Sequence, residues 1–183
     1  MADLHKALTT LDCSGDTEKK DIIKKIRDYI EQANYKIIDE DITKPWGAYF
    51  RLDGNQADKF TTEFFPGLNP EEARLGNPNA ELSPKILLVA PEQRLSWQYH
   101  HERAERWAFL TDGGYHKSLS DDQGNLQYAH EGDIVQFATG ERHRLAGVIG
   151  QWTLVAEIWQ HTNPEIPSNE ADIVRLADDY SRS

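Results

Sequence analysis

The stretch "SWQYHHERAERWAF", from Ser96 to Phe109, decides the fold, because aromatic side chains alternate in it with polar ones. Side chains on a β-strand alternate between the two faces, so Trp97 and Tyr99 are expected on one face and Gln98 and His100 on the other. A polar pair on the inner face of a strand is costly unless something binds it. The stretch therefore predicts a strand that carries a binding site.

The chain around this stretch predicts a mainly β protein. From Trp46 onward, short apolar runs alternate with clusters rich in Gly, Pro, Asn and Asp, which is typical of an antiparallel sandwich or barrel. Residues 16–33 show helical periodicity, with an apolar stripe formed by Ile22, Ile26 and Ile30. We expect a mobile tail before this helix, a strand over residues 35–42, a long loop over residues 61–83 and a short helix near residues 169–180. The predicted domains are residues 1–34, a tail and helix packed on the barrel, and residues 35–183, the β domain.

Composition narrows the class of protein. A chain of 183 residues with 38% hydrophobic residues suits one globular domain, and its formal charge of −11 argues against nucleic acid or an anionic membrane as the main partner. Cys13 is the only cysteine, and no apolar run is long enough to span a bilayer. We therefore expect a cytoplasmic protein without intramolecular disulfides.

The spacing of polar residues in the same stretch predicts a metal site. Gln98 and His100, two residues apart on a strand, face inward together, and Glu105 can return to the same point after a bend. The natural fourth ligand is His143, in "EGDIVQFATGERHRLAG", just after the turn at Gly140. Two nitrogens, a carboxylate and an amide oxygen suit one divalent metal ion, with zinc, iron, manganese or nickel conceivable. The alternative is a barrel whose polar residues satisfy one another by hydrogen bonds without a metal.

Three motifs resemble a known family. "KPWGAY" (44–49), "SWQYHHERAERW" (96–107) and "EADIVRLADDYSR" (170–182) are similar to stretches of the cupin domain of type II mannose-6-phosphate isomerases. The resemblance implies a single cupin barrel (a double-stranded β-helix, or jelly roll) and a homodimer. It also implies that the metal, zinc first, is held by Gln98, His100, Glu105 and His143. The family often carries a nucleotidyltransferase domain before the cupin, whereas in this sequence we expect a helix at that place. The loop 61–83 looks like an insertion that changes the sugar.

Basic residues next to the motifs predict a phosphate site in this acidic chain. The candidates are Lys85, Arg94, Arg103, Arg142, Arg144 and Arg175. Arg103 and Arg175 come first because they lie within matched motifs, and Lys85 and Arg144 are further substrate-binding candidates. The resemblance implies a metal-dependent isomerase that interconverts mannose 6-phosphate and fructose 6-phosphate, or a related small phosphorylated sugar. Glu157, or else Glu102, is the candidate base, and Arg175 would grip the phosphate and orient the carbonyl.

Two other classes of function stay open. One is a non-catalytic cupin that binds a sugar or an acid, and the other is a different metal-dependent cupin enzyme, such as a dioxygenase or an epimerase. Gln98 weighs against iron-dependent oxygen chemistry, which favours histidines and one carboxylate.

Overall fold

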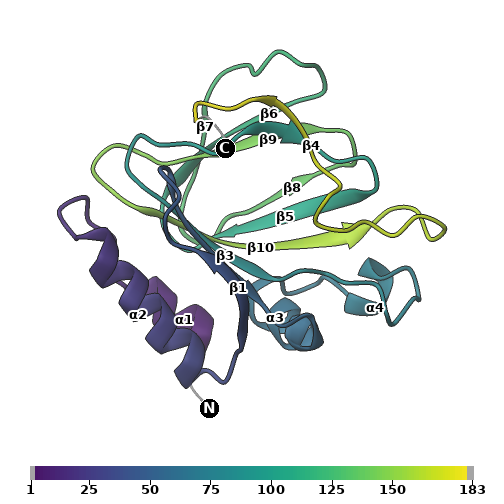
Figure 1. Cartoon of the computed structure of the whole chain (residues 1–183), viewed down its shortest axis with the longest axis horizontal. Coiled ribbons are helices and arrows are strands. Elements are labelled where there is room, and N and C mark those ends of the chain that lie inside the picture. The colour runs from purple at the N-terminus through teal and green to yellow at the C-terminus, as the bar shows by residue number, and fades with distance from the viewer. Residues whose placement is uncertain (1–2, 181–183) are drawn as a thin grey trace.

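The computed structural model describes residues 3–180 and contains two antiparallel β-sheets that face each other, with helices against one of them (Figure 1). The six-stranded sheet has the order β1 (Ile37–Asp41), β2 (Gly47–Leu52), β3 (Lys85–Val89), β10 (Thr153–His161), β5 (Arg103–Phe109) and β8 (Ile134–Phe137). The five-stranded sheet has the order β11 (Val174–Ala177), β4 (Trp97–Tyr99), β9 (Arg142–Ala146), β6 (Gly113–Ser118) and β7 (Gln127–Ala129). The prediction of a mainly β barrel is confirmed.

The space between the sheets has an apolar end and a polar end. Trp107 and Phe109 on β5 pack there with Val155 on β10, and all three side chains are buried. Glu105 lies two residues before Trp107 on the same inner face of β5, and Arg103 lies two residues before Glu105. Because inward positions recur every second residue, one strand supplies both the core and the polar end.

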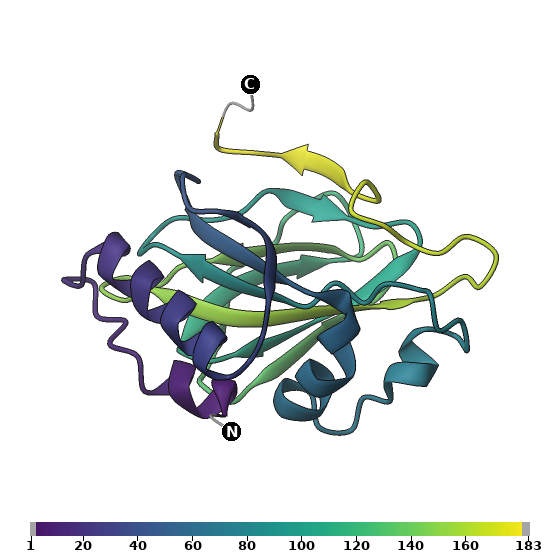
Figure 2. The same cartoon turned by 60° about the horizontal axis from the view of Figure 1, so that its bottom comes forward.

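Helices cover the outer face of the six-stranded sheet (Figure 2). They are α1 (Leu4–Thr9), α2 (Lys19–Gln32), η1 (Gly54–Gln56), α3 (Ala57–Phe64) and α4 (Pro70–Ala73). The predicted stripe on α2 is buried in this layer, so the helix prediction is confirmed. The expectation of a mobile N-terminal tail is wrong for the described residues from Asp3, which caps α1, because Leu4 and Leu8 are fully buried in the same layer.

The long connection before β3 belongs mainly to this outer layer. Phe65, Ala73 and Leu82 are buried with the helices. Only the end of the connection, at Glu81 and Ser83, reaches the polar end of the barrel. The segment thus has helices of its own and contributes two polar groups to the interior.

The C-terminal segment is a strand where the sequence predicted a short helix. β11 pairs antiparallel with β4, with Val174 opposite Tyr99 and Arg175 opposite Gln98. The edge of β4 offers unpaired backbone groups, and pairing with them outweighs the local helical pattern. None of the helices within residues 3–180 has the length and apolar character needed to cross a bilayer.

Candidate metal centre

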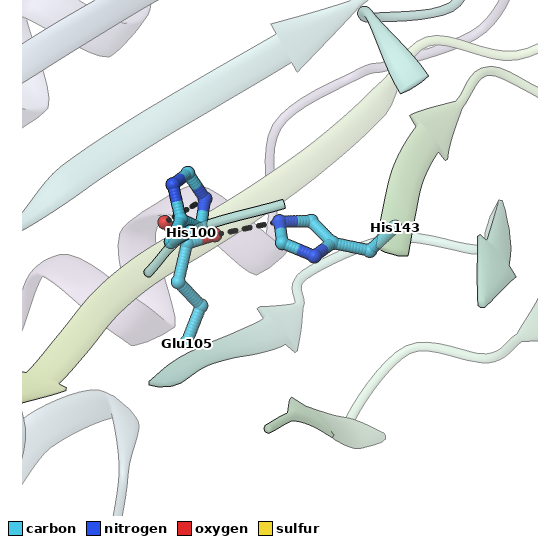
Figure 3. Close-up of side chains that lie close together, drawn as sticks. All are labelled: His100, Glu105 and His143. Atoms are coloured by element: carbon cyan, nitrogen blue, oxygen red, sulfur yellow. Dashed lines mark ion pairs between the residues drawn. The ribbon is translucent and has the colours of Figure 1, made fainter. Parts of the chain in front are cut away.

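Three side chains from the two sheets converge at the polar end of the barrel (Figure 3). His100 follows β4, His143 lies on β9 of the same sheet, and Glu105 faces them from β5. Glu105 Oε1 lies 3.0 Å from His100 Nε2, and Glu105 Oε2 lies 3.2 Å from His143 Nε2. All three side chains are almost completely buried. This arrangement could bind a metal ion.

The hydrogen bonds of the two histidines leave a gap that a cation fits. His100 Nδ1 lies 2.6 Å from the carbonyl oxygen of Asp172, and His143 Nδ1 lies 2.9 Å from that of Glu141. A carbonyl only accepts, so both Nδ1 atoms carry the proton. In the neutral rings each Nε2 then points a lone pair at the carboxylate. Both Nε2 atoms and Glu105 Oε2 are buried without a hydrogen bond, and one shared cation would satisfy all three.

Glu105 is held as a carboxylate. Burial alone would raise its pKa, but the charge of His100, when its ring is protonated, and the charge of Arg103 hold the pKa well below its usual range. Arg103 Nε donates to Glu105 Oε1 at 3.0 Å, and its guanidinium stacks 3.9 Å from the ring centre of Trp159. Arg103 is also buried and donates to the carbonyl of Asn169. The contacts of Arg103 therefore orient Glu105, a candidate metal ligand. Sequence reasoning had assigned Arg103 to substrate binding instead.

Gln98 lies beside the cluster. It is opposite His143 in the register of β4 and β9, so the two residues share the inner face of the sheet. Its Oε1 accepts a hydrogen bond of 2.6 Å from Ser96 Oγ. A carboxamide oxygen has a second lone pair, so this bond leaves one site for a metal.

Asp172, which sequence reasoning missed, ties the C-terminal segment to the metal motif. Its carboxylate accepts hydrogen bonds from the backbone N–H groups of His101 (2.8 Å) and Glu102 (3.0 Å) and from Ser168 Oγ (2.7 Å). Its carbonyl oxygen is the partner of His100 Nδ1. One residue, distant in sequence, thus fixes both the turn between β4 and β5 and the orientation of a histidine.

Glu157 stands on the same inner wall as Glu105, one strand away. It is opposite Trp107 in the register of β10 and β5, and Trp107 Nε1 donates to its Oε2 at 2.9 Å. Lys85 Nζ lies 3.4 Å from the other oxygen. Burial, followed by the nearby charge of Glu105, raises the pKa of Glu157. The structure thus places a proton-accepting group beside the cluster.

A second ionic group adjoins Glu157. Lys85 also lies 3.1 Å from Glu170, whose carboxylate contacts Arg51 and Ser83 as well. Arg51 and Glu170 were missed by sequence reasoning. Alternation in "AYFRL" places Arg51 on the face opposite to Phe50 and Leu52. This face is the inner one only because the helical layer buries Phe50 and Leu52 from outside, which the sequence did not show.

Other predicted residues lie apart from the cluster. Arg144 neighbours His143 on β9, and side chains alternate, so it lies on the other face, where it binds Asp179 and Gln123. Arg175 is exposed on β11, in the inner-face row of Gln98 and His143. The remaining candidates engage acidic partners, Arg94 with Asp179 and Arg142 with Asp121. Two further histidines, His116 and His161, are also buried.

Comparison with known proteins supports the fold. No family model matches the sequence, and no curated protein matches it either. The capsular polysaccharide assembling protein CapF from Staphylococcus aureus superposes on 86% of this chain with a TM-score of 0.50 and 12% identity, and the match spans 37% of CapF. A conserved Klebsiella pneumoniae protein with a double-stranded β-helix domain matches 53% of this chain and 71% of its own, with 14% identity and a TM-score of 0.44.

The fold is a cupin barrel, a double-stranded β-helix. Two antiparallel sheets that face each other with this strand order form such a barrel. At these identities the likeness concerns the fold alone. The resemblance to type II mannose-6-phosphate isomerases thus rests on the quoted motifs.

Proposed function

We propose that this cupin is a metal-dependent isomerase of a small phosphorylated sugar, of the mannose 6-phosphate to fructose 6-phosphate type. The observation that supports it most is the pairing of a candidate metal cluster with a separate buried carboxylate, Glu157, on the adjoining strand. Isomerisation needs a group that moves a proton between neighbouring carbons, and the raised pKa suits Glu157 to that work.

The other side chains have positioning tasks. His100, Glu105 and His143, with Gln98 as fourth ligand, would hold a divalent ion, zinc first, which supplies a Lewis acid for the sugar's oxygens. Glu157 takes the proton from the second carbon and returns it to the first, while the proton of the second carbon's hydroxyl passes to the oxygen of the first. Trp107 and Lys85 keep its carboxylate in place through their contacts with its two oxygens. Arg175 on the outer edge of the sheet would attract the anionic substrate.

The test is turnover by the purified, metal-loaded protein on a panel of hexose and pentose phosphates, followed by NMR in deuterium oxide. Wild type should exchange the proton at the second carbon and form the ketose, and Glu157→Gln should do so about a hundredfold or more slowly. Loss of activity in Glu157→Gln with bound metal retained would place the residue in proton transfer. If the protein converts none of the sugar phosphates, the proposal is wrong.

A second candidate is a metal-dependent oxygenase. Two histidines and one carboxylate are the usual set for non-haem iron enzymes, and Gln98 Oε1 already has a partner in Ser96. Iron(II)-loaded protein that consumes dioxygen with an organic acid, and leaves every sugar phosphate unchanged, would favour this function. Ligand binding without either reaction would instead identify a binding cupin. We expect a homodimer in each case, which light scattering can test.

A further inference from the structure

The carboxylate of Glu170 lies between two cations of the inner wall. Its Oε1 is 3.1 Å from Lys85 Nζ and 3.2 Å from Arg51 Nε, and it accepts a hydrogen bond from Ser83 Oγ. Arg51 and Lys85 are opposite each other in the register of β2 and β3, so their side chains share the inner face. The two cations thus belong to adjacent strands of the barrel wall.

Glu170 is more exposed than the two cations that it contacts, and it is not on a strand. The side chains of Lys85 and Arg51 are 11% and 21% exposed, whereas that of Glu170 is 41% exposed. Glu170 comes from the connection between β10 and β11, whereas its partners come from strands. Arg51 Nε is buried without a hydrogen bond although Glu170 lies at ion-pair distance. The wall therefore retains an unsatisfied donor that a better placed anion could use.

We propose that Arg51 and Lys85 form the phosphate-binding site of the substrate, and that Glu170 fills this site until the phosphate displaces it. The inference rests on the proposed function only in that the phosphate belongs to the substrate. An oxyanion with several acceptor atoms can satisfy both cations and the free Nε together, which one carboxylate oxygen does not.

The position of this site suits a substrate that extends towards the metal cluster. Lys85 lies on β3, two strands from Glu105 on β5, and neighbouring strands are about 4.8 Å apart. The backbones are therefore on the order of 10 Å apart. Glu157 on β10 lies between them, so a sugar phosphate bound at Lys85 would pass the candidate base.

The test is the affinity for inorganic phosphate, measured by calorimetry on the full chain. Glu170→Gln keeps the shape of the side chain but removes a negative charge next to Lys85 and Arg51, which keep their contacts with Glu157 and Glu81. The variant should therefore bind phosphate on the order of tenfold more tightly than wild type. Adding Arg51→Met or Lys85→Met to Glu170→Gln should abolish that gain. Glu165→Gln is the matched control, because it removes the same charge from an exposed position in the same connection and should leave affinity unchanged.

Equal phosphate affinity in wild type and Glu170→Gln would overturn the proposal, as would a gain that survives loss of Arg51 or Lys85. If Arg51→Met does not fold, Arg51→Lys must still lose part of the gain, because an ammonium cannot form the planar fork. Mannose 6-phosphate should show the same gain in Glu170→Gln and unphosphorylated mannose should not, which assigns the site to the phosphate of the sugar. Phosphate binding without turnover would retain this site and reject the isomerase.

Discussion

The two ends of the barrel interior are built on the same strands and serve different purposes. On β5, Trp107 and Phe109 are buried among apolar side chains, while Glu105, on the same face, meets two histidines. On β10, Val155 belongs to the apolar end and Glu157 to the polar end. A residue two positions further along the strand faces the same side of the sheet but lies among different neighbours. Strand alternation thus decides which residues point inward, and position along the strand decides whether they stabilise the fold or form the site.

The largest effect is expected at the apolar end. Phe109→Ala should lower the free energy of unfolding by about 3–5 kcal/mol, because it leaves a cavity where a fully buried ring was. Affinity for cobalt(II) should not change, since Phe109 lies at the apolar end, four residues along β5 from the candidate ligand Glu105. Denaturant unfolding and a cobalt titration measure the two quantities. Tyr128→Ala, at a side chain 68% exposed, should change neither. A parallel loss of metal affinity in Phe109→Ala would show that the two ends are coupled.

At the polar end, His143→Ala and His100→Ala should have the converse effect. Four-ligand sites hold zinc by about 10–16 kcal/mol, so one ligand contributes roughly 2.5–4 kcal/mol. Metal affinity should therefore fall on the order of a hundred- to a thousandfold, and the metal should be lost on dialysis. The fold should remain, because the apolar end and the helical layer are untouched. Metal analysis and circular dichroism are the measurements, and His130→Ala at the surface is the control. Full metal occupancy in both variants would contradict the site.

A smaller effect is expected from Asp172→Ala, which sharpens the boundary of the polar end. The variant keeps every candidate ligand but frees the turn between β4 and β5, so cobalt affinity should fall about 10- to 100-fold. Asp179→Ala is the control, because Asp179 also anchors the C-terminal segment but bonds to Arg94 and Arg144 on the outer side. Equal losses in both variants would mean that general anchoring of the segment, and not Asp172 itself, supports the site.

Sequence reasoning recovered what local patterns encode. Alternation in residues 96–109 located β4 and β5, and the apolar stripe located α2. Sequence reasoning also identified three candidate metal ligands, His100, Glu105 and His143, because their spacing on strands limits where their side chains can point. Whether they and Gln98 bind a metal stays a prediction.

What sequence reasoning missed depends on contacts between distant segments. Asp172 and Glu170 lie in the quoted motif 170–182, but the motif does not show what they contact. Their contacts form only when β11 pairs with β4 and brings them to the barrel. The helical reading of residues 169–180 failed for the same reason, since pairing with a sheet edge overrides local propensity. Arg144 was ranked by its proximity to His143 in sequence, although adjacent strand residues face opposite sides.

The smallest effect on activity is expected from substitution of Arg175. This substitution tests how far the polar end of the barrel extends. Its exposed position on β11 means that its attraction for a substrate phosphate acts through solvent, which screens it. Arg175→Ala should therefore lower kcat/KM for the sugar phosphate by no more than about fivefold at low salt, which corresponds to about 1 kcal/mol. The loss should lie in KM and disappear at high salt, and Arg175→Lys should restore most of it because only charge is needed. Steady-state kinetics at two ionic strengths measure this. A hundredfold fall in kcat that salt does not alter would mean that Arg175 grips the phosphate and orients the carbonyl, as predicted from the sequence. It would extend the polar end of the barrel to its outermost strand.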